Sequence, residues 1–250
     1  MTDTIGAETL VLKLGGSVIT AKDEPETVDE AALERAVAAV AESEAAVVLV
    51  HGGGSFGHHY AARHGVSTTA GTRDAAALTE IHRTMGDLNA AVVDALQERG
   101  VPALPVRPLS VAARNGNLSF PLGGVDAMLG EGFVPVLHGD VIVDAGNGGT
   151  ILSGDEVVVA VARGLGADRV GLCSTVPGVL DDEGNVIPEI DAFDQVSGAV
   201  GESTATDVTG GMAGKVQCLL ELDTPAAIFG LADLDRFLRT GSAGTTVNGR

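Results

Sequence analysis

The stretch V-L-V-H-G-G-G-S-F-G-H-H, residues 48–59, decides the fold. A short apolar run that ends in glycine is typical of a buried strand, and a helix is predicted to begin just after the glycines. Bare glycine amides at a helix N-terminus form an anion site, because unpaired N–H groups and the positive end of the helix dipole point outward. The stretch therefore predicts a phosphate site at Gly53 and Gly54, with His58 as a possible donor to a phosphate oxygen.

The same glycines also spell G-x-G-x-x-G, at Gly52, Gly54 and Gly57. A dinucleotide site would need a second strand soon afterwards that ends in an acidic residue, and the polar residues 65–72 predict none. The Walker pattern of P-loop enzymes is absent from the sequence. Phosphate binding is therefore predicted without either motif.

Apolar runs alternate with helical patterns on both sides of this stretch, which indicates an α/β fold with a mainly parallel central sheet. One domain over residues 1–250 is expected, with an N-terminal lobe to about residue 150 and a C-terminal lobe over 151–250. Strands are predicted at 9–14, 46–51, 102–106, 133–137, 169–173 and 226–229. Helices are predicted at 27–43, opened by a capping box at Thr27, and at 73–99, 155–165, 211–222 and 233–240. A hairpin is predicted across 140–152.

Lysine is almost absent from the chain, and its three positions are Lys13, Lys22 and Lys215. Each lies in or beside a glycine-rich or turn-like segment, and a compact ammonium suits phosphate oxygens. L-K-L-G-G-S, residues 12–17, places Lys13 near the end of the first predicted strand. Ligands of parallel sheets lie beyond the carboxyl ends of strands, so Lys13 and the glycine amides are expected to face one crevice. Lys22 follows in a loop that could fold over it.

Two later segments add charged groups at predicted helix starts. S-G-D-E, residues 153–156, places Asp155 at the start of a helix, with Ser153 or Asp155 itself as the N-cap. T-D-V-T-G-G-M-A-G-K, residues 206–215, is a second glycine turn with Lys215 in the first turn of the following helix. That pattern suits the β- and γ-phosphates of a nucleotide.

Taken in order, L-K-L-G-G-S, H-G-G-G-S-F-G-H, H-G-D-V-I-V-D, I-L-S-G-D-E and D-V-T-G-G-M-x-x-K resemble the motifs of the amino acid kinase family across nearly the whole chain. The resemblance implies an αβα sandwich that transfers the γ-phosphoryl of ATP to a carboxylate or phosphate, with Mg²⁺, in a homodimer. His58 after the triple glycine resembles the archaeal branch whose acceptor is isopentenyl phosphate, which serves isoprenoid synthesis. The N-terminal lobe would bind this acceptor and the C-terminal lobe the nucleotide.

The resemblance also implies roles for single residues. Lys13 and Lys215 would contact the ATP phosphates, Lys22 would approach from its loop, and Asp155 would orient the lysines. The acceptor phosphate would be held by Gly53, His58 and Gly154. The remaining nucleotide contacts would be Gly15, Gly16, Ser17, Gly54, Ser174, Thr175, Gly178, Gly210 and Gly211. Thr175 stands where the family usually has an acid.

The isopentenyl tail requires an apolar pocket. Leu78, Ile81 and Met85 share one face of the helix predicted over 73–99, and we expect this face to line the pocket. The alternative is that the face is ordinary core.

Composition narrows the remaining possibilities. The chain has 34 acidic and 15 basic residues and a formal net charge of −19, which argues strongly against nucleic acid or an anionic membrane as a partner. Such a surface resembles proteins of salt-loving organisms. No signal peptide or membrane span is predicted, which favours the cytoplasm. Cys173 and Cys218 are predicted to be buried thiols, and no metal-ligating residues are predicted.

Two alternatives remain open at this point. One is another small-molecule kinase of the same fold, acting on fosfomycin or a similar phosphate or phosphonate. The other is a non-catalytic nucleotide-binding protein, against which the three lysines and Asp155 argue. A panel of acceptors distinguishes the alternatives.

Overall fold

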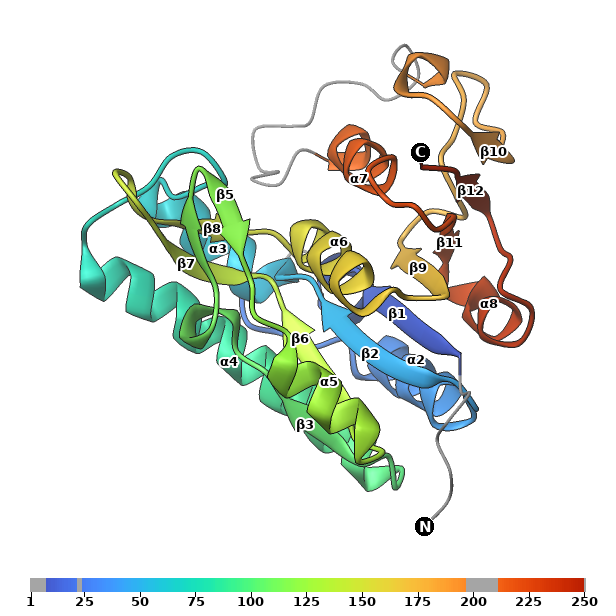
Figure 1. Ribbon diagram of the computed structural model, residues 1–250, viewed down its shortest axis with the longest axis horizontal. Helices are drawn as coiled ribbons and strands as arrows, with labels where there is room; N and C mark the ends of the chain where they lie inside the picture. The colour runs from blue at the N-terminus through green and yellow to red at the C-terminus, as the bar shows by residue number, and fades with distance from the viewer. Residues whose placement is uncertain (1–7, 22–23, 197–210, 250) are drawn as a thin grey trace.

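The computed structural model describes residues 8–21, 24–196 and 211–249. It confirms the predicted α/β class: an eight-stranded sheet lies between two layers of helices (Figure 1). The strand order is β10-β12-β11-β9-β1-β2-β6-β3, and only the β11–β12 pair is antiparallel. The strands of this sheet are β1 Thr9–Leu14, β2 Ala46–His51, β3 Ala103–Pro105, β6 Val134–His138, β9 Arg169–Ser174, β10 Glu189–Ile190, β11 Ala226–Gly230 and β12 Thr245–Val247.

The α-helices are α1 Gly16–Ile19, α2 Glu30–Ala41, α3 Gly54–His64, α4 Ala75–Glu98, α5 Gly123–Gly130, α6 Gly154–Leu165, α7 Gly211–Leu219 and α8 Leu234–Thr240. Short 3-10 turns lie at Pro108–Ser110, Phe193–Gln195 and Leu231–Asp233. No helix within the described residues is long and apolar enough to cross a membrane.

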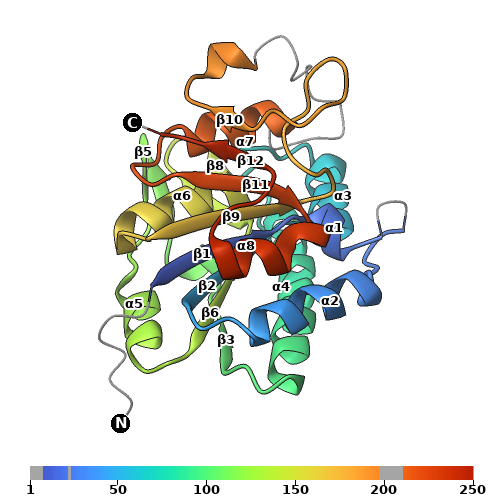
Figure 2. The same cartoon turned by 90° about the vertical axis from the view of Figure 1, so that its right-hand side faces the viewer.

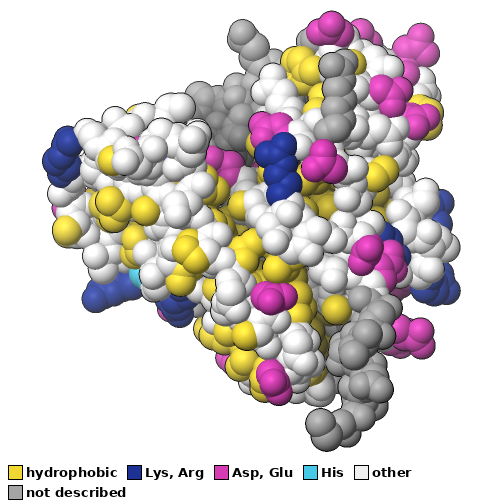
Figure 3. All heavy atoms as spheres, viewed as in Figure 1, with side chains coloured by type: hydrophobic (Ala, Val, Ile, Leu, Met, Phe, Trp, Pro, Cys, Tyr) yellow, Lys and Arg dark blue, Asp and Glu magenta, His cyan; other side chains and the backbone are white. Residues whose placement is uncertain are grey.

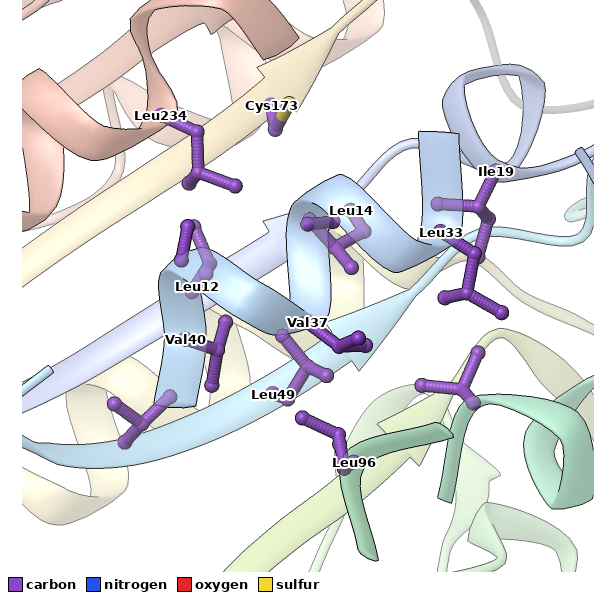
Figure 4. Close-up of a cluster of buried hydrophobic side chains, with 14 of the residues drawn as sticks. Leu12, Leu14, Ile19, Leu33, Val37, Val40, Leu49, Leu96, Cys173 and Leu234 are labelled. Carbon is purple, nitrogen blue, oxygen red and sulfur yellow. The ribbon is translucent and has the colours of Figure 1, made fainter. Parts of the chain in front are cut away.

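Strand alternation decides which side chains face which helix layer. On β1, Leu12 and Leu14 point to the layer formed by α2, α4 and α8, where they join a buried apolar cluster (Figure 4). Figure 2 shows α2 and α8 on this same side of the sheet. Val11 belongs to the opposite cluster, against α6 and α7. Because alternate residues of a strand share a face, Lys13 lies on the Val11 side, toward α6.

A second, four-stranded sheet has the order β5-β4-β7-β8, with β4 Ala113–Asn115, β5 Asn117–Ser119, β7 Asp140–Asp144 and β8 Gly148–Leu152. The predicted hairpin over 140–152 is confirmed as β7 and β8, while β4 and β5 are additions that the sequence did not predict. A small apolar cluster joins this sheet to α3 and α4: Ala61, Ile81, Val141 and Ile151 are buried together with Val66.

The helix boundaries depend on caps that the sequence only partly indicated. The helix predicted from Thr27 begins at Glu30, because Asp29 is its N-cap and accepts a hydrogen bond from the Ala32 amide at 3.0 Å. For α6, Ser153 rather than Asp155 is the N-cap, in a capping box with Glu156. The division into two lobes at about residue 150 stays a prediction. The central sheet runs through both halves of the chain, because β9 from the second half pairs directly with β1.

Candidate active site

The carboxyl ends of β1, β2, β6 and β9 lie side by side, because these strands are parallel neighbours. Two adjoining hollows open there. The phosphate crevice, of about 130 Å³, is lined by Lys13, Gly15, Gly16, Ser17, Val18, Gly52, Gly53, His58, Gly154, Asp155, Ser174, Thr175 and Lys215. The apolar pocket, of about 40 Å³, is lined by Gly53, Gly57, His58, Ala61, Ile81, Met85, Gly139, Asp140, Ile151, Leu152, Ser153 and Gly154. The two hollows share Gly53, His58 and Gly154.

A buried ion pair lies in the wall of the phosphate crevice. The Lys13 Nζ donates to the Asp155 Oδ1 at 2.5 Å, and the two side chains are only 7% and 6% exposed. Burial lowers the pKa of Lys13, the nearby Lys215 lowers it further, and Asp155 opposes both effects. The Lys13 stem passes Gly154 closely enough that an added Cβ there would lie 3.1 Å from the Lys13 Cε. A side chain at Gly154 would therefore press against the lysine stem, which would have to shift by a few tenths of an ångström.

The loops after β1 and β2 touch through their backbones. A Cβ on Gly52 would lie 2.6 Å from the Gly16 nitrogen, and one on Gly16 would overlap the Gly54 backbone. This contact requires glycine at these positions. It explains why both loops can present amides to the same crevice.

Lys215 reaches the crevice from the first turns of α7, where its Nζ also donates to the Gly211 carbonyl at 3.2 Å. Ser174 and Thr175 reach it from the end of β9. Three residues that the resemblance assigned to the nucleotide are not among those lining the crevice: Gly54 is buried behind Thr20, Gly211 lies at the start of α7, and Gly178 packs against Thr245 and Val186. Lys22 and Gly210 lie outside the described residues.

His58 lies on α3 at the junction of the two hollows and lines both. Ile81 and Met85 of α4 line the apolar pocket and are 1% and 2% exposed, so they are at the same time core. Leu78 is not among the lining residues and packs against Gly149 of β8 instead. A Cβ on Gly57 would lie 2.7 Å from the Met85 Sδ, which gives this third glycine of G-x-G-x-x-G a packing reason.

Beneath the crevice lie two buried histidines that sequence reasoning missed. His51 ends β2 and His138 ends β6, and their rings stack with centroids 5.4 Å apart. The Asn89 Nδ2 lies 3.1 Å from the His51 Nε2, and it also donates to the Val136 carbonyl at 3.2 Å. The Nε2 of His51 therefore accepts, and its Nδ1 donates to the Gly52 carbonyl at 3.1 Å. Burial, followed by His138, lowers the pKa of His51 to about 3.

The sequence model of the amino acid kinase family matches residues 8–223. This chain belongs to the amino acid kinase family. Isopentenyl phosphate kinase of Haloferax volcanii is 62% identical over 96% of this chain and 98% of its own. Isopentenyl phosphate kinase of Methanocaldococcus jannaschii is 33% identical over 84% of this chain and 85% of its own.

Solved structures agree with this assignment. A crystal structure of an isopentenyl phosphate kinase superimposes with a TM-score of 0.83 and 28% identity, covering 96% of this chain and 99% of that one. The substrate complex of an isopentenyl phosphate kinase gives a TM-score of 0.78 and 26% identity, covering 96% and 99%. The predicted amino acid kinase fold is thereby confirmed.

For this amino acid kinase family member, the residues that the sequence missed are mostly on the apolar side. Asp140, Ile151 and Leu152 line the pocket from β7 and β8. The segment H-G-D-V-I-V-D indicated the family, but its residues were not predicted to line the pocket. Its Asp140 is buried and lies 2.9 Å from the His82 Nδ1, and it accepts from the Leu109 and Val141 amides.

Proposed function

We propose that this protein transfers the γ-phosphoryl group of ATP to isopentenyl phosphate and forms isopentenyl diphosphate. The observation that carries the proposal is the position of His58. It lies where a crevice with two lysines and two glycine loops meets a pocket lined by Ile81 and Met85. An acceptor with an anionic head and an apolar tail fits that junction. The 62% identity to an isopentenyl phosphate kinase supports the same acceptor.

The transition state of phosphoryl transfer is loose and anionic, so the protein has to position the groups and neutralise charge. Lys13 and Lys215 line the crevice and supply this charge, and Lys22 is proposed to add to it. Asp155 holds the Lys13 ammonium in place through their ion pair. The acceptor phosphate is itself a competent nucleophile, so no strong base is required.

His58, Gly53 and Gly154 are proposed to hold the acceptor phosphate, because these are the residues that line both hollows. The donor phosphates would then lie over Gly15, Gly16 and Ser17, between Lys13 and Lys215. Ser174 and Thr175 at the end of β9 are proposed to lie on the nucleotide side.

We propose Mg²⁺ as the cofactor. Asp155 is the one carboxylate among the described residues that line the crevice, and it is already paired with Lys13. No group of three or more acidic, histidine or cysteine side chains that could hold a metal is present in the described residues. The crevice therefore fits an ion held mainly by the phosphates of ATP and by water, as Mg²⁺ commonly is. Bound there, it would neutralise charge on the donor phosphates.

We also propose a homodimer that works in a salt-rich cytoplasm. The homodimer is what the family resemblance implies. The net charge of −19 supports the salt-rich surroundings, and Cys173 and Cys218, which are unpaired thiols in this structure, support a reducing compartment. Acidic side chains are scattered over the centre and right of the face in Figure 3, in keeping with this surface charge.

The test is ATP-dependent phosphorylation of isopentenyl phosphate in molar KCl, with product identified by mass. Dimethylallyl phosphate, fosfomycin, UMP and acetylglutamate serve as competing acceptors. The proposal expects isopentenyl phosphate to have the highest kcat/KM. A higher value for fosfomycin would refute the acceptor while keeping the reaction class, and no transfer to any acceptor would refute catalysis.

A further inference from the structure

Thr20 connects the two glycine loops behind the phosphate crevice. It follows α1 and is buried, with 3% exposure. Its hydroxyl donates to the Gly16 carbonyl at 2.8 Å and accepts from the Ser55 backbone amide at 3.1 Å. Gly16 is the first residue of α1, directly after β1, and Ser55 lies in the first turn of α3, after β2. One hydroxyl therefore links the two loops directly.

The surroundings leave this hydroxyl little freedom to move. Gly54 approaches so closely that a Cβ on it would overlap the Thr20 Oγ1. The Thr20 backbone forms a bridge with Val28, and the Ser55 hydroxyl donates to the Thr27 carbonyl at 3.4 Å. The hydroxyl therefore lies at a fixed point between the loops, where both of its hydrogen bonds are satisfied.

The spacing of the two loops matters because both present backbone amides to phosphate. Such amides stabilise an anionic transition state only when they are held in place beforehand. A displacement of about 1 Å in a reacting geometry can lower the rate by on the order of 100-fold. The residue that sets the distance between the loops therefore affects the transfer step more than substrate binding.

We propose that Thr20 is a positioning residue for phosphoryl transfer, whose hydroxyl holds the loop at Gly16 and the loop at Ser55 at the spacing that the donor and acceptor phosphates require. The proposal rests on the proposed function of the crevice. Thr20 touches no substrate in this scheme and acts through the two loops.

The test compares Thr20→Val with Thr20→Ser. Valine keeps the branched shape and removes the hydroxyl, whereas serine keeps the hydroxyl. We expect Thr20→Val to lower kcat by about 10–100-fold, with KM for ATP and isopentenyl phosphate within roughly threefold of wild type. Thr20→Ser should restore most of kcat. Hydrogen exchange of the Ser55 amide should be faster in Thr20→Val, because this amide has lost its acceptor. It should be near wild type in Thr20→Ser, which keeps the hydroxyl.

Thr150→Val is the matched control. Thr150 is fully buried, and its hydroxyl also links two groups: it accepts from Arg114 at 3.2 Å and donates to Asp144 at 3.2 Å. It lines neither hollow. This variant should lower the melting temperature and leave kcat unchanged. A Thr20→Val enzyme with wild-type kcat, or a Thr20→Ser enzyme as slow as Thr20→Val, would overturn the proposal.

If Thr20→Val does not fold, Thr20→Ala and Thr20→Ser provide the same comparison, since both lack the methyl group and differ by the hydroxyl. Equal kcat in this pair would refute the proposal. Failure of the proposed function is seen separately, in the acceptor preference of the wild type, because the variant-to-wild-type ratio of kcat can be measured with whichever acceptor is phosphorylated. A wild type that phosphorylates no acceptor would overturn both.

Discussion

The Lys13 ammonium and the Asp155 carboxylate form a buried ion pair at the start of α6, with 2.5 Å between Nζ and Oδ1. Lys215 lines the same crevice, but its Nζ donates to a backbone carbonyl, that of Gly211. The two lysines therefore differ in what their removal leaves behind. Removing Lys13 leaves a buried carboxylate without its cation, whereas removing Lys215 leaves no such group among the described residues.

Lys13→Ala and Lys215→Ala should both lower kcat more than they raise the KM for the acceptor, because their charge meets the developing transition state. Only Lys13→Ala should also lose roughly 3–5 kcal/mol of unfolding free energy, the usual cost of breaking a buried pair. Denaturant unfolding and steady-state kinetics measure the two effects. Lys13→Arg should rescue poorly, since a planar fork does not replace a point charge. Wild-type turnover in Lys215→Ala would remove it from the mechanism.

His58→Ala should slow phosphorylation and leave the fold intact. One charge-assisted hydrogen bond to the acceptor phosphate would be lost, on the order of 1.5–3 kcal/mol of kcat/KM. The circular dichroism spectrum should not change. His59→Ala, the exposed neighbour on α3, is the matched control and should retain wild-type kinetics. Full kcat and KM in His58→Ala would exclude it as a substrate ligand.

The sequence predicted that Lys13 and the glycine segments face one crevice, and the structure brings them together, because these signals are local. At 12–17 a strand end, a lysine and glycines lie within a few residues of each other, and at 48–54 a buried strand runs directly into three glycines. Parallel pairing of β1 with β2 brings the two segments together. The second sheet was missed because β4 and β5 are short, polar and largely exposed, so no periodicity marks them. Leu78 was expected at the apolar pocket but does not line it, because a helix face offers more positions than a small pocket uses. The stacking of His51 on His138 depends on the register between β2 and β6, which no local sequence pattern specifies.

Chain-length preference should change when the apolar pocket is enlarged. At about 40 Å³ the pocket has room for little more than one water molecule, so a five-carbon tail requires side chains to move. Met85 is unbranched and adaptable, and Met85→Ala should raise the kcat/KM for geranyl phosphate relative to isopentenyl phosphate. Ile81→Ala should act in the same direction.

Leu88→Ala is the control for this pair of variants. Leu88 is a fully buried residue of the same helix and does not line the pocket. It should lose about 2–5 kcal/mol of stability with no change in preference. If Met85→Ala and Ile81→Ala behave as Leu88→Ala does, the helix face is only core.

Stability should fall at mildly acidic pH through His51. Its pKa is lowered to about 3 in the folded protein by burial and by His138, whereas an unfolded histidine takes up a proton near pH 6.5. Below that pH the unfolded state binds the extra proton, so the unfolding free energy decreases by about 1.4 kcal/mol per pH unit as the pH falls from 6.5 toward 3. The contribution is fully present above pH 6.5. In urea titrations at constant KCl, His51→Asn should reduce this slope by about one proton; an identical slope would contradict the assignment.

Salt should support both folding and activity. Dilution lengthens the screening distance from about 3 Å at 1 M to about 30 Å at 0.01 M, so acidic side chains repel across the surface and the compact state weakens. With a net charge of −19, the same field should raise the KM for ATP and for the acceptor before the protein unfolds. Melting temperature and initial rates, followed from molar KCl downward, measure both. A melting temperature that stays flat or rises on dilution would show that the acidic surface is no salt adaptation.

His58 lies between two groups of structural elements that can change independently in evolution. The loops after β1, β2 and β9 and the starts of α6 and α7 surround the phosphates, while α4 and the β7–β8 hairpin contribute only to the apolar pocket. Random change in Ile81, Met85 or Ile151 can therefore alter which molecule is accepted without disturbing the lysines. With this arrangement, acceptor preference can evolve by single substitutions while the residues of the phosphate crevice stay the same.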